Sequence, residues 1–137
     1  MDADPKTHIL ILDDEPIVCK RLKPAFEKQG YVIEVYTDSA KAMSRIQDKE
    51  FDIVITDLKM KHINGMQFLT AIKEKSPDTE VIVITGFATM ETAKESFQKG
   101  VFDFVAKPFK IGEIQEIVKK AEKRRSKRFS SLQSPAV

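Results

Sequence analysis

Short apolar runs alternate along the chain with segments of helical periodicity, and this alternation limits the fold more than any other feature. The runs lie at residues 8–12, 32–36, 51–56, 81–85 and 102–106. β-branched and aromatic residues are prominent in most of them, as is typical of strands. Between the runs, apolar residues recur at helical spacing, for example Val18, Leu22 and Phe26. Because the first, third and fourth runs are apolar nearly throughout, the pattern predicts an α/β fold, (βα)5, with a doubly wound five-stranded parallel sheet.

Residues at the ends of the predicted helices support these boundaries. Asp38 or Ser39, and Asn64, can cap helices, and Gly30 can end one. Pro24 is the exception because it lies inside the first helix, where proline removes a backbone hydrogen bond and costs about 3 kcal/mol in an undistorted helix. We therefore expect a kink at Pro24.

Length and composition favour a single domain. The chain has 137 residues, of which 42% are hydrophobic, so we expect one modest core. No run approaches the roughly 18 apolar residues that span a bilayer, and the N-terminus lacks the order of a signal peptide. We therefore expect a soluble, cytoplasmic protein with no membrane contact. The single cysteine, Cys19, excludes an internal disulfide and a Cys-rich zinc site, so a bound metal should have oxygen ligands.

Charge is distributed unevenly along the chain. Residues 119–128 carry seven Lys or Arg against one Glu, whereas the whole chain has a net charge of only +2, so the remainder is acidic. This balance argues against direct DNA binding by the domain. We expect one domain over residues 1–122, followed over residues 123–137 by a basic extension of the last helix, solvated like most charge runs, and a flexible tail.

Polar residues follow four of the predicted strands at their carboxyl ends. Asp13 and Asp14 follow the first, Asp57 the third, Thr85 and Gly86 end or follow the fourth, and Lys107 follows the fifth. A doubly wound sheet places its ligand at this edge. Any one acidic residue here could simply cap a helix, but four such ends together indicate a site.

The chemistry of these side chains favours Mg²⁺ and a phosphoryl group. Like charges 4 Å apart repel by about 4 kcal/mol at an effective dielectric constant of 20, and Mg²⁺, which prefers oxygen ligands, would offset that repulsion. The Lys107 ammonium, the Thr85 hydroxyl and the Gly86 backbone N–H suit phosphoryl oxygens. Asp57 is then the candidate nucleophile.

Several spaced motifs resemble the receiver domains of two-component response regulators. They are residues 9–15 (ILILDDE), 52–60 (DIVITDLKM), 64–65 (NG), 83–86 (VITG) and 100–109 (GVFDFVAKPF). The resemblance covers roughly residues 6–122. It implies a flavodoxin-like fold similar to that of chemotaxis regulators, with strand order 2-1-3-4-5; the spacing alone does not give this order.

The resemblance also implies a role for each site residue. Asp57 would accept a phosphoryl group from a sensor histidine kinase or a phosphotransfer protein, and Lys107 would pair with the phosphoryl oxygen. The bond from Lys107 to the following proline resembles the family's cis peptide. Mg²⁺ would be bound directly by the carboxylates of Asp14 and Asp57 and the backbone carbonyl of Lys59, and mainly through water by Asp13.

Output would follow from a switch pair. Thr85 and Phe104 resemble the family's switch residues, whose movement reshapes the face of the fourth helix, fifth strand and fifth helix. Residues 89–93 (TMETA) resemble receivers that precede ATPase transcription activators. The expected protein is a regulator and not an enzyme, acting on a downstream protein target or a linked output domain. A phosphorylation-dependent homodimer is also left open.

Two departures from the family pattern stand out. Lys61 occupies a position where the family often has proline, so the loop after the third strand is expected to be less rigid or differently bent. Lys59 and Phe87 occupy the positions that commonly tune loss of the phosphoryl group. Because a phenyl ring cannot orient water by hydrogen bonding, we expect slow self-dephosphorylation.

Other classes fit the sequence less well. A dehalogenase-type phosphatase needs Asp-x-Asp after a strand, and no Walker loop for nucleotides is present. A flavodoxin-like electron carrier would place a flavin phosphate against Asp13, Asp14 and Glu15, which would repel it. The remaining alternative is a receiver-fold docking scaffold that is never phosphorylated.

Overall fold

The computed structural model describes the backbone of residues 6–133 and the side chains of residues 6–126. Its strands are β1 (His8–Leu12), β2 (Val32–Tyr36), β3 (Ile53–Thr56), β4 (Glu80–Thr85) and β5 (Asp103–Ala106). Its helices are α1 (Pro16–Glu27), α2 (Ser39–Asp48), α3 (Gly65–Lys75), α4 (Met90–Gln98) and α5 (Ile111–Gln133). All strands pair in parallel, in the order β2-β1-β3-β4-β5. The predicted (βα)5 flavodoxin-like fold and its strand order are confirmed.

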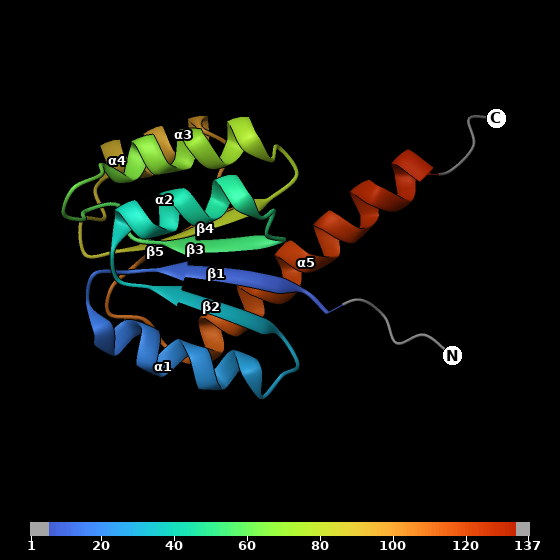
Figure 1. The fold of residues 1–137 in the computed structure, drawn as a ribbon, viewed down its shortest axis with the longest axis horizontal. Helices are drawn as coiled ribbons and strands as arrows, with labels where there is room; N and C mark the ends of the chain where they lie inside the picture. Colours follow the sequence, from blue (N-terminus) through green and yellow to red (C-terminus); the bar gives the residue numbers. More distant parts are fainter. Residues whose placement is uncertain (1–5, 134–137) are drawn as a thin grey trace.

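Helices cover both faces of the sheet, α1 and α5 on one side and α2, α3 and α4 on the other (Figure 1). Successive residues of a strand point to opposite faces. In β1, Ile9 and Ile11 therefore pack with α1 and α5, whereas Leu10 and Leu12 pack with α2 and α3. This arrangement explains why β1 is apolar at nearly every position.

Local signals fix most helix ends as expected. The side chain of Asp38 accepts hydrogen bonds from the backbone of the first turn of α2, and Asn64 forms a capping box with Gln67 at the start of α3. Gly30, just beyond α1, has a φ of 94°, which favours glycine. Helix α1 continues through Pro24 to Glu27, so the proline lies near its end.

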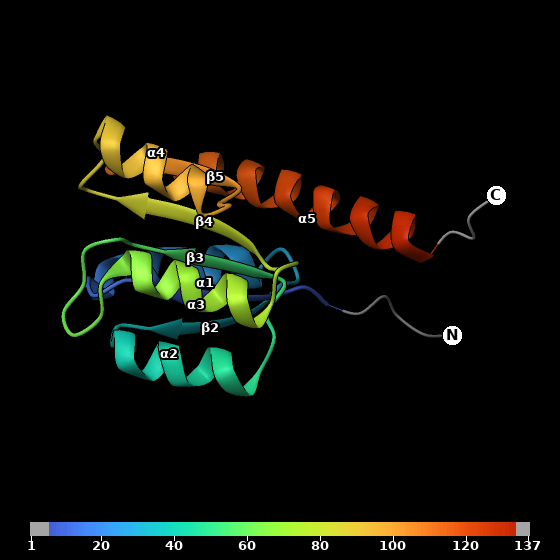
Figure 2. The same cartoon turned by 90° about the horizontal axis from the view of Figure 1, so that it is seen from above.

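Helix α5 extends beyond the body of the domain at the edge of the sheet where the strands begin (Figure 2). Arg124, in the part of α5 that still packs on the domain, forms two hydrogen bonds, of 2.5 and 2.9 Å, with Glu80. The Glu80 carboxylate is fully buried at the start of β4. Arg125 lies 2.6 Å from Asp52. These arginines of the basic stretch therefore bind the sheet and are not merely solvated. Of the helix extension and tail expected over residues 123–137, residues 134–137 lie outside the described residues.

Within the described part of the chain, no helix is both long enough and apolar enough to cross a membrane.

Candidate functional site

Three carboxylates meet at the edge of the sheet where β1 and β3 end. Leu12 and Thr56 lie opposite each other in these neighbouring strands, so Asp13 and Asp57 leave the sheet side by side. The Asp57 N–H donates a 3.1 Å hydrogen bond to the Leu12 carbonyl and so fixes the end of β3. Carboxylate oxygens of Asp13, Asp14 and Asp57 all lie within 4.8 Å of one another. The structure therefore brings these three predicted site residues together.

Lys107 joins this cluster from the end of β5. Its Nζ lies 2.8 Å from Asp13, 2.7 Å from Glu15 and 2.9 Å from Asp57. Burial lowers the pKa of Lys107, but the hydrogen bonds to these carboxylates outweigh burial and raise the pKa above its usual range. The ammonium is therefore held in its charged form. The peptide bond from Lys107 to Pro108 is cis, as expected.

Glu15 also contacts Lys107, and no role in the site was predicted for it from the sequence. It occupies the N-cap position of α1, but its side chain makes no capping hydrogen bond and instead contacts Lys107. An acidic residue at this point could cap a helix through its side chain, but the Glu15 side chain does not. The adjacency of three acidic residues after β1 was the available signal.

Asp57 is buried but lines an open cavity. One of its carboxylate oxygens, Oδ1, accepts hydrogen bonds from the backbone N–H groups of Leu58 (2.6 Å) and Lys59 (3.3 Å), and the other, Oδ2, contacts Lys107. Asp57 lines a cavity of about 380 Å³ together with Asp14, Lys59 and other residues of the adjoining loops. A reactant can therefore approach this carboxylate.

The charge balance of the cluster fits a divalent cation. Burial raises the pKa of Asp13, and the nearby charge of Asp57 adds to this rise, whereas hydrogen bonds from Lys107 and from the Glu15 N–H act against it. Lys107 contacts three acidic side chains, those of Asp13, Glu15 and Asp57, and Asp14 adds a fourth carboxylate to the cluster. Such an excess of carboxylate oxygens suits a hard cation such as Mg²⁺.

The remaining predicted residues lie on or beside β4 and β5. Thr85 is fully buried, and its hydroxyl accepts a 3.0 Å hydrogen bond from the Phe87 N–H. Gly86 lines the same cavity as Asp57. Phe104 is partly buried and packs against the apolar cluster beneath α2 and α3.

Lys59 and Phe87 face each other across the cavity. The Lys59 Nζ lies 4.0 Å from the centroid of the Phe87 ring, a cation–π contact, and both residues line the cavity that contains Asp57. The sequence singled out both positions separately but gave no signal that they pair.

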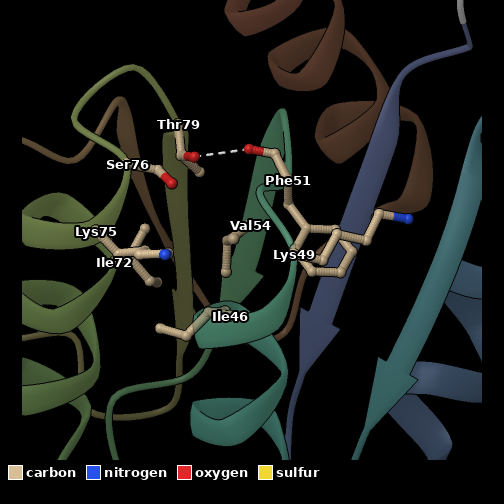
Figure 3. Close-up of a pocket in the computed structure, with 8 residues that line it drawn as sticks. All are labelled: Ile46, Lys49, Phe51, Val54, Ile72, Lys75, Ser76 and Thr79. Carbon is tan, nitrogen blue, oxygen red and sulfur yellow. Dashed lines mark hydrogen bonds between the residues drawn. The ribbon is translucent and has the colours of Figure 1, made fainter.

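A second cavity lies between α2 and α3 at the opposite end of the sheet (Figure 3). Its volume is about 10 Å³, which is room for about one water. Thr79 donates a 2.6 Å hydrogen bond to the Phe51 carbonyl beside it. The cavity is too small to bind a substrate.

Comparison with known proteins decides the family. The family model for the response regulator receiver domain matches residues 9–119. The chain belongs to the response regulator receiver family. Receiver domains typically bind Mg²⁺ at an acidic pocket, and this domain has an aspartate cluster in the corresponding fold.

Curated relatives of this receiver domain include two bacterial regulators. The regulatory protein AtoC of Escherichia coli is 35% identical over 113 residues, which are 82% of this chain and 24% of AtoC. The transcriptional regulatory protein ZraR of Salmonella typhimurium is 30% identical over 116 residues, 85% of this chain and 26% of ZraR. The receiver domain thus spans about a quarter of the length of these relatives.

Solved structures agree with this fold. A CheY-like receiver domain protein from Methanospirillum hungatei has a TM-score of 0.87 at 23% identity, with 90% of this chain and 99% of that chain covered. The beryllofluoride-activated NtrC4 receiver domain dimer has a TM-score of 0.81 at 31% identity, covering 86% of this chain and 98% of that one.

Proposed function

We propose that this receiver domain is a phosphorylation switch in which Asp57 accepts a phosphoryl group from a phosphohistidine of a sensor kinase or phosphotransfer protein. The observation that carries the proposal is the position of the Asp57 carboxylate, which lines a cavity of about 380 Å³ and lies 2.9 Å from the Lys107 ammonium. A carboxylate in that position can act as an oxygen nucleophile.

In the transfer, a bond forms between phosphorus and a carboxylate oxygen of Asp57 as the phosphorus–nitrogen bond of the donor breaks. The backbone N–H groups of Leu58 and Lys59 orient the carboxylate by holding Oδ1. Lys107, which reaches Oδ2, neutralises charge on the phosphoryl oxygens. The donor imidazole leaves neutral after taking up a proton.

The residues that would hold Mg²⁺ are the carboxylates of Asp13, Asp14 and Asp57 and the backbone carbonyl of Lys59. Three of them already offer oxygens within 4.8 Å of one another. When bound, the cation would neutralise negative charge that develops on the transferring group.

Thr85 and Phe104 would convert phosphorylation into a change of surface. In this proposal the Thr85 hydroxyl leaves the Phe87 N–H for a phosphoryl oxygen, and the Phe104 ring turns into the vacated space. The surface affected is that of α4, β5 and α5, where Met90 and Phe97 on α4 are 89% and 50% exposed. Exposed apolar side chains favour a protein partner.

The output we propose is a transcription activator, either linked to the chain or bound to it; in support, ZraR is by name a transcriptional regulatory protein and AtoC a regulatory protein. A phosphorylation-dependent homodimer is a further proposed state, supported by the NtrC4 receiver domain dimer. Self-dephosphorylation should be slow, since the Phe87 ring, held by Lys59, covers part of the cavity and cannot orient a water.

Labelling with a small phosphodonor tests the proposed function. Incubation with acetyl phosphate and Mg²⁺ should add the mass of one phosphoryl group, and beryllofluoride with Mg²⁺ should shift the amide resonances around Asp57. The Asp57→Asn variant should show neither change while it keeps its far-UV spectrum. A wild-type protein that gains no mass and shows no spectral change would instead be a docking scaffold.

A further inference from the structure

The loop between β3 and α3 carries Lys59, Met60 and Lys61, all of which line the cavity at Asp57. This is the loop in which lysine stands where related sequences often have proline. Its conformation must therefore be fixed by other means, because Lys61 has no ring to restrict its own backbone.

A buried serine on a different element contacts this loop. Ser39, the first residue of α2, is 2% exposed, and its hydroxyl donates a 2.6 Å hydrogen bond to the Lys61 carbonyl. The hydroxyl is not needed to cap α2, because the side chain of Asp38 already accepts from the backbone N–H groups of Ala40 and Lys41. Its described partner lies instead in the loop.

The loop itself holds a backbone conformation that needs support. His62 has a φ of 70°, and the Ile63 N–H donates a 2.8 Å hydrogen bond to the Lys61 carbonyl. Together these describe a γ-turn with positive φ, which is rare and strained. The Lys61 carbonyl thus accepts from both Ser39 and Ile63 and lies at the point where the strained turn is tied to α2.

The other end of the same loop is fixed by glycine. The Gly65 N–H donates a 3.0 Å hydrogen bond to the Leu58 carbonyl, and a Cβ at Gly65 would overlap the Leu58 backbone. Leu58 and Lys61 are therefore both held, and the short segment between them contains Lys59.

We propose that Ser39 is a positioning residue for the metal-binding loop: through the Lys61 carbonyl, its hydroxyl sets the backbone position of Lys59 and so the affinity of the acidic cluster for Mg²⁺. The inference rests on the proposed function, which assigns the Lys59 carbonyl to the cation. Loss of an outer contact that orients a ligand typically lowers metal affinity 10–100-fold.

The test compares Ser39→Ala with wild type in the 137-residue chain, using Mg²⁺ as the probe. Titration is followed by the amide resonances of Leu58 and Lys59, which donate to Asp57. We expect the Kd of Ser39→Ala for Mg²⁺ to rise by about tenfold. Ser39→Thr, which keeps the hydroxyl, should restore the affinity to within about twofold of wild type by the same reasoning.

Amide hydrogen exchange gives a second readout that needs no metal. In Ser39→Ala, protection of the Ile63 N–H should fall, while protection in β1 should not change. Ser44→Ala, at an exposed position of the same helix, is the matched control and should alter neither readout.

The possible outcomes separate this inference from the proposed function. If wild type binds Mg²⁺ and Ser39→Ala binds it equally well, the positioning role is refuted and the proposed function stands. A lower stability with unchanged Mg²⁺ affinity would make Ser39 purely structural. If wild type shows no Mg²⁺ binding, the proposed cation site fails, and the positioning role toward the cation fails with it.

Discussion

Replacing Asp57 by asparagine should stabilise the protein in the absence of divalent cations, although it removes the proposed phosphorylation site. Asp57 lies within 4.8 Å of carboxylate oxygens of both Asp13 and Asp14. At an effective dielectric constant of 20, each such pair repels by about 3.5 kcal/mol, and the two pairs together by about 7 kcal/mol.

The attraction to Lys107 does not fully offset this repulsion. At 2.9 Å, it amounts to about 6 kcal/mol on the same basis. The difference of about 1 kcal/mol is a net repulsion on the Asp57 charge, and the cost of burying that charge, at 5% exposure, adds to it. Asparagine keeps an oxygen that can accept from the Leu58 N–H and carries no charge. We therefore expect the free energy of unfolding to rise by about 1–2 kcal/mol.

Urea unfolding in EDTA, followed by far-UV circular dichroism because the chain has no tryptophan, measures this change. Asp48→Asn, at an exposed position of α2, is the control and should change stability little. Adding Mg²⁺ should make wild type more stable than Asp57→Asn. A bound ion at a hundredfold excess over its Kd stabilises the folded state by about 2.7 kcal/mol, and the variant lacks one of the carboxylates that would bind it. A loss of stability of more than about 1 kcal/mol in EDTA would refute the electrostatic reasoning.

Three further predictions concern other parts of the molecule. The hydrogen bond from Arg45 lowers the pKa of the Glu34 carboxyl to about 2. The stability that the ionised Glu34 contributes is therefore present above pH 4.5 and is lost as the pH falls towards 2. In Arg45→Ala, the free energy of unfolding should not show this loss at low pH. Gly65→Ala should destabilise the domain by about 1–3 kcal/mol in urea because its Cβ would meet the Leu58 backbone. Phe87→Asn should speed loss of phosphate from the labelled protein, and an unchanged rate would contradict the shielding by Phe87.

The sequence located Asp13, Asp57 and Lys107 because parallel strands finish at a common edge, so residues that follow them must converge. It could not place the Glu15 side chain, since a carboxylate at the start of a helix can either cap that helix or turn to a distant lysine. The Ser39 contact with Lys61 and the stacking of Lys59 on Phe87 depend on loop conformation, which has no periodic signal.

Glu80 shows the same limit within the core. The sequence predicted the fourth strand over residues 81–85, whereas β4 begins one residue earlier, at Glu80. Glu is rarely buried without a partner. Glu80 is paired with Arg124, 44 residues further along the chain. A contact between residues so far apart in the sequence produces no pattern in the residues around either of them. A charged pair of this kind becomes visible only when the strand and the last helix are placed against each other.

The ion pair at Glu80 gives β4 a functional group at each end, a carboxylate at its first residue and the Thr85 hydroxyl at its last. Thr85, its last residue, directly precedes Gly86, which lines the acidic cavity, whereas Glu80, its first, is bound by Arg124 of α5. A double-mutant cycle between Thr85 and Arg124 would measure, as a coupling free energy, how strongly the two ends of β4 depend on each other.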